Sequence, residues 1–168
     1  LFYVLNEDDK KLAEKYMEKS LALDPSDESA LHAQAHMLED KKEWNKLLDV
    51  CEIALEENED DYDFLTWEAT AFLNLNELEE AYGSITKCIV ENPEQGDAWY
   101  NLACYYALKG ENQNAIHKLV VATHLLELDD DGTQTVVDKL TEDPMLDGLR
   151  DDEDFRKQFV ALFEIEKI

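Results

Sequence analysis

Hydrophobic residues recur along this chain at the spacing of an amphipathic α-helix. In AWYNLACYYALKGENQNAIHKLVVATHL, residues 98–125, apolar side chains return every three or four positions, as they do in a helix with one buried face. The polar run KGEN interrupts that spacing, and Gly110 within it suits a reversal of the chain. The stretch therefore predicts two helices joined by a tight turn.

The same pattern returns along the chain with a period of 34 residues. Several columns keep this period without an insertion, which indicates a repeat array. The aligned columns are Leu31, Leu65 and Trp99; Ala35, Ala69 and Ala103; Leu38, Phe72 and Tyr106; Ala13, Leu47, Ala81 and Ala115; Met17, Cys51, Ile85 and Leu119; and Ser20, Ala54, Cys88 and Ala122. Because helix axes approach closely only where one helix offers a small side chain, we expect the alanines to lie at helix contacts. Trp99 and Tyr106 are then expected to fill the space beside them.

Predicted helices and turn signals alternate from residue 8 to residue 126. Turns fall at DKKE, LNE and KGEN, and Pro25 ends a helix because it lacks a backbone N–H. Asp27 or Ser29, and Asp97, are predicted N-caps. The predicted helices span residues 8–22, 28–40, 43–57, 62–75, 78–91, 96–109 and 112–126. The chain is thus predicted to be all-α and built from helical hairpins.

The best-preserved repeat resembles the tetratricopeptide repeat (TPR) family, whose signature is W-x2-L-G-x2-Y, then A-x3-F, then P. The matching residues are Trp99, Leu102, Ala103 and Tyr106 in the first helix and Ala115, Leu119 and Ala122 in the second. Glu127 stands where the family has its closing proline. The resemblance covers residues 6–129 and implies a right-handed α-α superhelix. It divides the chain into a partial first repeat at 1–27 with a truncated first helix, full repeats at 28–61, 62–95 and 96–129, and a helical capping tail at 130–168.

The tail departs from the 34-residue period. VVDKL predicts a further helix, and Phe155, Phe159, Leu162 and Phe163 form an apolar helical stripe. A repeat array must cover its terminal apolar face, so capping is one interpretation of this stripe. Contact with another chain is the alternative. The segment DPMLDGLRDDEDFRKQF also resembles the DP-x-L-x-x-LR-x-D-x-x-F tail of bacterial TPR proteins.

Composition narrows the range of partners. The net charge of −26 would repel nucleic-acid phosphates and anionic lipid headgroups, so we expect neither nucleic-acid binding nor membrane insertion. No apolar run approaches the roughly 20 residues that cross a bilayer. Three widely spaced cysteines without a CxxC motif are typical of reduced, buried thiols. These features predict a cytoplasmic protein, and the start at Leu1 in place of Met predicts that a longer chain precedes it.

The sequence offers little catalytic or cofactor chemistry. His32 and His36 lie one helical turn apart, but Ala33 stands where zinc proteases have glutamate, so two groove-facing imidazoles are the preferred interpretation. ELDDDGTQTVVD resembles a calcium loop with the wrong residues at its first and last positions, which favours a solvated turn. We therefore predict no enzyme activity, no cofactor and no metal site.

Function is then expected in a surface. In TPR proteins the first helix of each repeat lines a concave groove, and by position this implies the lining residues Ser29, His32, His36, Asp63, Thr66, Thr70, Asp97, Tyr100, Asn101 and Cys104. Chaperone-cofactor members of the family bind acidic peptides through lysine, arginine and asparagine side chains. Among the lining residues predicted here, only Asn101 is of one of these types, so an acidic peptide is a poor candidate ligand. The hypothesis is a non-catalytic scaffold for a basic or mixed protein segment with an apolar anchor against Tyr100.

Three alternatives remain open at this point. The groove residues are simply solvated if the binding surface lies in repeats outside this sequence. The chain forms homo-oligomers if Leu1, Phe2, Val4 and Leu5 pack against a second copy. It acts as a secretion-type chaperone if an apolar client segment binds, and such binding would persist at high salt.

Overall fold

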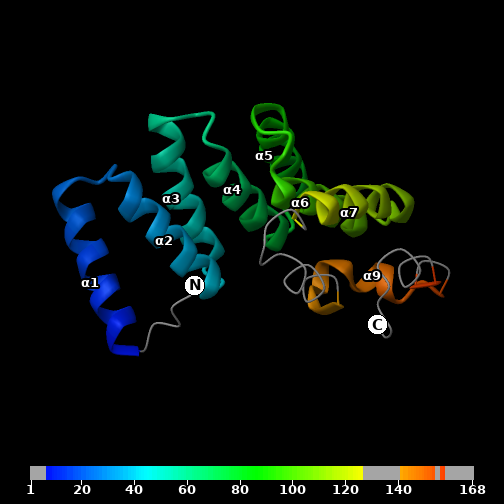
Figure 1. The fold of residues 1–168 in the computed structure, drawn as a ribbon, viewed down its shortest axis with the longest axis horizontal. Helices are drawn as coiled ribbons and strands as arrows, with labels where there is room; N and C mark the ends of the chain where they lie inside the picture. The colour runs from blue at the N-terminus through cyan, green and yellow to red at the C-terminus, as the bar shows by residue number, and fades with distance from the viewer. Residues whose placement is uncertain (1–6, 127–140, 154–155, 158–168) are drawn as a thin grey trace.

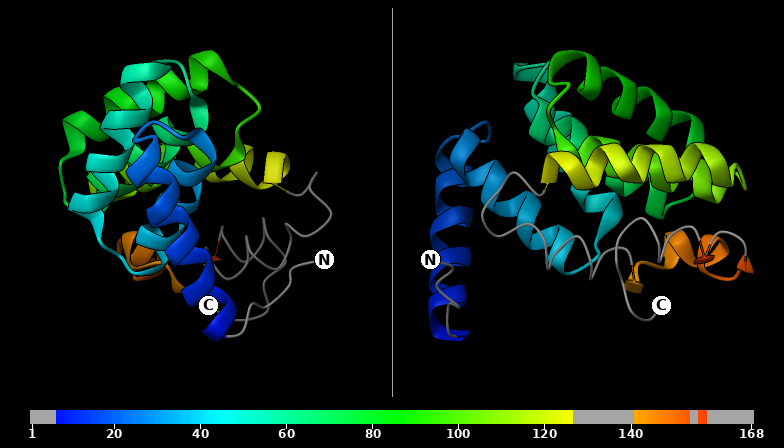
Figure 2. Two further views of the ribbon diagram at one scale, coloured as in Figure 1. Left: turned by 90° about the vertical axis from the view of Figure 1, so that its left-hand side faces the viewer. Right: turned by 45° about the vertical axis from the view of Figure 1, so that its right-hand side comes forward.

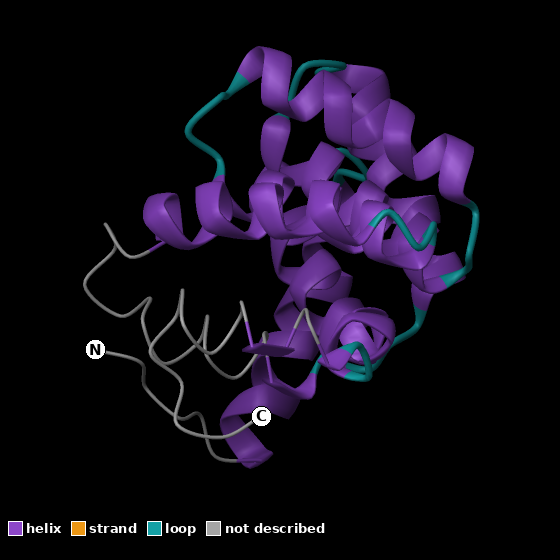
Figure 3. Ribbon diagram, turned by 90° about the vertical axis from the view of Figure 1, so that its right-hand side faces the viewer, coloured by secondary structure: helices purple, strands orange, loops and turns teal. Residues whose placement is uncertain are grey.

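The computed structural model describes residues 7–126, 141–153 and 156–157, and every regular element within these ranges is helical (Figure 3). The helices α1 to α7 follow one another in a row of antiparallel hairpins (Figure 1). Their bounds agree with the predicted ones to within one residue at each end. They are α1 Glu7–Leu23, α2 Glu28–Asp40, α3 Trp44–Glu57, α4 Tyr62–Asn74, α5 Leu78–Glu91, α6 Gly96–Leu108 and α7 Asn112–Leu126, followed by the 3-10 helix η1 Pro144–Leu146 and by α9 Asp147–Arg150.

Aspartate side chains begin two of these helices. Asp27 caps α2 by accepting a hydrogen bond from the backbone N–H of Ala30 at 2.9 Å, and Ser20 of α1 donates to its other oxygen at 2.9 Å. Asp61 caps α4 in the same manner. The prediction for Asp97 is wrong, because α6 begins at Gly96 and its N-cap is Gln95. Asp97 lies in the first turn, where its charge suits the positive end of the helix dipole.

Each hairpin turn uses one residue with positive φ, and these residues are also 34 apart. Gly110 has φ +72°, as its sequence context predicts, while Lys42 (56°) and Asn76 (60°) take the same conformation in the two preceding repeats. The backbone N–H of the next residue then reaches back to the helix at 2.8–2.9 Å in all three turns. The repeat thus preserves the turn geometry even where it does not preserve glycine.

The small-residue columns lie inside the helix contacts. Ala35, Ala69 and Ala103 are at most 1% exposed, and the second-helix alanines Ala81 and Ala115 are fully buried. Trp99 and Tyr106 are only partly buried and pack against the edge of this core, so they fill less of the space between helices than the sequence predicts. The boundaries of the repeats remain a prediction, because the array can be divided either at the loops within hairpins or at the loops between them.

The first helices of successive repeats lie against one another as well as against their hairpin partners. Contacts between α2 and α4 and between α4 and α6 bring these three helices to one face of the array, as the two rotated views help to follow (Figure 2). This face is where the resemblance predicts a groove. None of the described helices is long and apolar enough to cross a membrane.

The described part of the tail covers the last hairpin. Both η1 and α9 contact α6, and Leu146 and Leu149 are 1% exposed within the core that α6 and α7 share. The predicted capping region is confirmed for these residues. VVDKL, the calcium-like stretch 127–138 and the stripe from Phe155 to Phe163 lie outside the described residues.

Candidate functional site

A groove of about 580 Å³ lies along the face formed by α2, α4 and α6. The turn between α2 and α3 adds one edge, and η1 adds another. Its lining residues are His32, His36, Glu39, Lys42, Trp44, Asp63, Thr66, Trp67, Thr70, Asn74, Gln95, Asp97, Tyr100, Asn101, Asp143, Pro144 and Met145. Polar and aromatic groups therefore share the surface.

Eight of the ten sequence-predicted residues line this groove, because the 34-residue period places equivalent side chains on the same helix face. The full column of His32, Thr66 and Tyr100 is present. The two exceptions are Ser29, which is exposed beside the groove, and Cys104, which is fully buried. Cys104 belongs to the core that also contains Leu146 and Leu149, so the tail covers the surface on which the repeat pattern would display it.

The structure also adds lining residues that the sequence prediction missed. Trp67 shares a 34-residue column with Asn101, so the period itself could have found it. Lys42 lies in a turn and corrects the expectation that the groove contains no basic residue. Asp143, Pro144 and Met145 come from the tail, which has no repeat pattern, and nothing in the sequence places them beside α6.

An aromatic cluster forms the α2 side of the groove. The ring of His32 meets Phe64 edge-on at 4.6 Å and Trp67 at 5.2 Å, and His36 meets Trp67 at 4.8 Å. The indole N–H of Trp67 donates to Glu39 at 3.0 Å. These contacts hold both imidazoles against α4.

The floor of the groove is held together by Asn101. Its side-chain amide donates to the carbonyl of Thr66 at 3.2 Å and to the hydroxyl of Thr70 at 3.0 Å, so one buried group joins α6 to α4. The two threonine hydroxyls donate to helix carbonyls at 2.7 and 2.9 Å. Because these donors are bonded within the protein, the side chains of the floor are held in a fixed arrangement.

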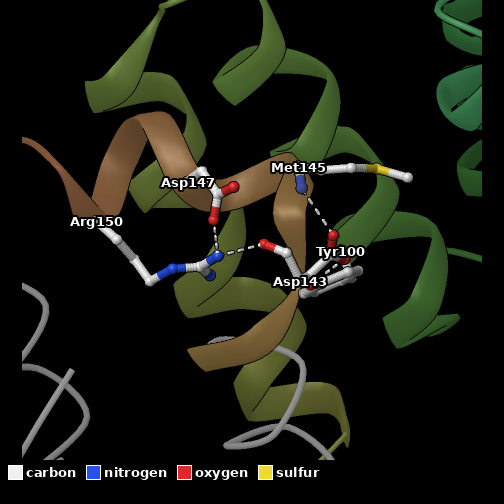
Figure 4. Close-up of polar contacts among 5 residues, drawn as sticks. All are labelled: Tyr100, Asp143, Met145, Asp147 and Arg150. Atoms are coloured by element: carbon white, nitrogen blue, oxygen red, sulfur yellow. Dashed lines mark hydrogen bonds and ion pairs between the residues drawn. The ribbon is translucent and has the colours of Figure 1, made fainter.

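The tail closes one end of the groove through a set of hydrogen bonds around Asp143 (Figure 4). The hydroxyl of Tyr100 donates to one carboxylate oxygen at 2.8 Å, and the backbone N–H of Met145 donates to the other at 2.9 Å. Arg150 donates to the Asp143 carbonyl at 2.7 Å and pairs with Asp147. Burial, together with Cys104 and Asp143 nearby, raises the pKa of Tyr100, so the phenol stays protonated and continues to donate.

The groove carries more negative than positive charge. Glu39, Asp63, Asp97 and Asp143 line it against the single lysine Lys42. Partial burial raises the pKa of Asp63, the neighbouring charge of Asp61 raises it further, and His32 and His36 oppose the shift. Gln95 donates to Asp63 at 3.4 Å. The carboxylate of Asp63 is therefore partly desolvated and repelled by a neighbouring negative charge.

Comparisons with known proteins identify the architecture. A family model described as tetratricopeptide repeat matches residues 2–27. No curated protein sequence matches the chain. Among solved structures, MamA is similar with a TM-score of 0.64 and 17% identity over 96% of this chain and 93% of MamA. YrrB, described as a TPR protein with an unusual peptide-binding site, is similar with a TM-score of 0.59 and 17% identity over 94% of this chain and 83% of YrrB.

At these identities the two solved structures establish the fold. The matched repeat at residues 2–27 and the 34-residue columns through the rest of the chain agree with that fold. Together they show that the chain has the all-α superhelical fold of tetratricopeptide repeat proteins.

Proposed function

We propose that the groove binds a basic or mixed segment of another protein and that the chain acts as a non-catalytic scaffold. The observation that carries this proposal is the charge of the lining, in which four carboxylates face one lysine. Asp63 is the central group, because its raised pKa reflects a carboxylate that is partly desolvated and repelled by its neighbours. Lysine or arginine on the ligand would pair with it.

The charge of the whole chain supports the same kind of partner. A net charge of −26 produces a field that attracts cationic segments and speeds their association, and this effect weakens as salt screens it. YrrB is a TPR protein with an unusual peptide-binding site. The similarity to YrrB supports the proposal that the groove of this chain binds a peptide.

The apolar anchor of the ligand is proposed to contact the edges of the groove. Tyr100, the anchor partner expected from the sequence, exposes only 6% of its surface, and its hydroxyl is bonded to Asp143. Trp44 on the α3 side and Met145 on the tail side are partly exposed and line the same space. A ligand with a positive charge near its centre and an apolar side chain toward either edge fits this distribution.

The proposal is tested by fluorescence anisotropy with three labelled peptides of equal length, in which lysine, serine or glutamate alternates with leucine. We expect the lysine peptide to bind best and its affinity to fall as sodium chloride rises. Replacing Asp63 and Asp97 by asparagine together should weaken that binding several-fold, because each lost ion pair contributes about 0.2–1 kcal/mol at an exposed site. The matched control is Glu52→Gln together with Glu56→Gln, which removes two exposed charges from α3 outside the groove.

Two results would contradict the groove proposal. Equal binding of the lysine and glutamate peptides would show that charge does not select the ligand. An equal loss of affinity in the Glu52→Gln, Glu56→Gln control and in the groove variant would show that only the overall charge matters. Binding of all three peptides that persists at high salt would instead favour the apolar-client chaperone.

Self-association is a second candidate function, favoured by the surface of α1. Leu12 and Tyr16 lie one turn apart on this helix and are 51% and 62% exposed. Two such faces would bury apolar area in a symmetric dimer. Light scattering should then show a mass that rises with concentration in the unmodified chain and stays monomeric in a Leu12→Ser, Tyr16→Ser variant. The N-terminal residues Leu1, Phe2, Val4 and Leu5 named for this role lie outside the described residues.

A further inference from the structure

A cluster of three metal-ligand side chains lies where α2 and α4 begin. One ligand atom from each of Glu28, His32 and Asp61 lies within 4.8 Å of the other two. We infer that these three side chains form a binding site for a divalent transition-metal ion, with Zn²⁺ as the expected occupant. The site goes beyond the proposed peptide groove, which shares His32 with it but neither carboxylate.

The backbone places the three side chains before any ion arrives. Glu28 and His32 are four residues apart on α2, so they project from consecutive turns of one face. Asp61 precedes α4 and uses one oxygen, Oδ1, to accept hydrogen bonds from the backbone N–H groups of Asp63 and Phe64 at 3.1 and 3.3 Å. Its second oxygen remains for a ligand, and the cap keeps the side chain in place.

The imidazole is oriented by aromatic contacts. Phe64 and Trp67 hold the ring of His32 edge-on at 4.6 and 5.2 Å, which limits its rotation. His36 does not join the cluster and packs against Trp67 instead. The structure therefore pairs His32 with two carboxylates from the helix ends, whereas the sequence spacing had pointed to His36.

A small cavity beside the cluster provides room for the rest of the coordination sphere. It has a volume of about 160 Å³, and Glu28 and Asp61 both line it, together with Ser26 and Asn58, whereas His32 lines the groove. A water molecule occupies roughly 30 Å³ in the liquid, so the space accommodates the waters that would complete the coordination of a three-ligand ion. The open side distinguishes this arrangement from a closed structural zinc site.

The donor set selects the kind of ion. Imidazole suits Zn²⁺, Co²⁺ and Ni²⁺, whereas Ca²⁺ and Mg²⁺ prefer oxygen ligands alone. The negative charge of the chain attracts all of these cations, so the imidazole provides the discrimination. The positive ends of the α2 and α4 dipoles oppose a cation at this position, and we therefore expect weaker binding than in four-ligand zinc sites.

The test is calorimetric titration of the metal-free full chain with Zn²⁺ in buffer that contains excess Mg²⁺ to occupy the acidic surface. We expect one saturable zinc site per chain. His32→Ala should weaken it by at least about 10-fold, since even indirect changes around metal ligands cost 10- to 100-fold. Asp61→Ser should do the same while preserving the helix cap, because serine also caps helices. His36→Ala is the matched control and should bind as the unmodified chain does.

A second measurement places the ion next to a defined side chain. Because the ring of Trp67 lies 5.2 Å from that of His32, bound Ni²⁺ should quench tryptophan fluorescence, and Trp67→Phe should remove most of the ion-dependent change. If His32→Ala does not fold, as judged by circular dichroism, Glu28→Gln and Asp61→Ser decide the question. The inference is overturned if zinc does not bind under excess Mg²⁺, or if folded ligand variants and His36→Ala bind it equally.

Discussion

Ala35 and Ala33 lie on the same helix, and they offer a direct test of why alanine recurs every 34 residues. Ala35 is fully buried where α2 meets its neighbours, whereas Ala33 faces solvent. Replacing either by leucine changes the same atoms in the same helix. We predict that Ala35→Leu destabilises the protein and that Ala33→Leu leaves its stability nearly unchanged.

The magnitude follows from the space available. Leucine adds three carbon atoms to alanine, and at Ala35 no solvent-accessible surface remains to receive them. Overpacking of this kind costs about 1–3 kcal/mol of unfolding free energy, because neighbouring side chains or the helices themselves must move. At Ala33 only the helix propensity changes, and alanine and leucine differ there by a few tenths of a kcal/mol.

Urea denaturation followed by circular dichroism measures both variants against the unmodified chain. With a slope of about 2 kcal/mol per M, a loss of 2 kcal/mol lowers the midpoint by about 1 M. Ala69→Leu and Ala103→Leu should behave as Ala35→Leu does, since they occupy the same column and are equally buried. Equal midpoints for Ala35→Leu and Ala33→Leu would refute the packing argument.

Three further predictions concern the groove, its charge and the core. Tyr100→Phe removes the hydrogen bond to Asp143 and should lower the unfolding free energy by about 1.5–3 kcal/mol, the range for hydrogen bonds to charged groups. Hydrogen exchange in residues 141–153 should become faster. Unchanged exchange would show that this bond does not hold the tail. Asp63→Asn should raise the unfolding free energy at neutral pH, because the raised pKa of Asp63 means that folding disfavours its charged form. In urea denaturation at a series of pH values, the gain should vanish as pH falls below the pKa of unfolded aspartate. A gain that persists in acid would contradict this cause. Burial raises the pKa of the Cys51 thiol, so a thiol reagent should modify it only at the rate of unfolding. Peptide mapping locates the modified cysteine. Rapid labelling of Cys51 in the native chain would disprove its burial.

The helices could be predicted almost to the residue because their signals are local. The spacing of apolar positions, the proline at position 25 and the glycine at position 110 act within a few residues of themselves. Asp97 shows the limit of such reasoning, because aspartate suits both an N-cap and a first turn, and the choice depends on where α6 begins. Lys42 shows another limit, since lysine does not indicate the positive φ that the repeat imposes, whereas asparagine, as at Asn76, is among the residue types that favour it.

The groove was partly predictable for the same reason. The 34-residue period carries a helix face from one repeat to the next, which identified His32, Thr66 and Tyr100 as neighbours. The period could not indicate that the tail covers Cys104 or that Asp143 bonds to Tyr100, because these contacts join segments with no shared pattern.

By itself, the sequence determined the helices, their period and the acidic character of the chain, since each depends on residue type and spacing along the chain. Only the tertiary structure decided which end of the groove is closed, that Lys42 joins its lining, and that Glu28 and His32 meet Asp61 across two helices. These features arise where distant segments meet, and their positions depend on how each hairpin rotates against the next, which no local pattern encodes.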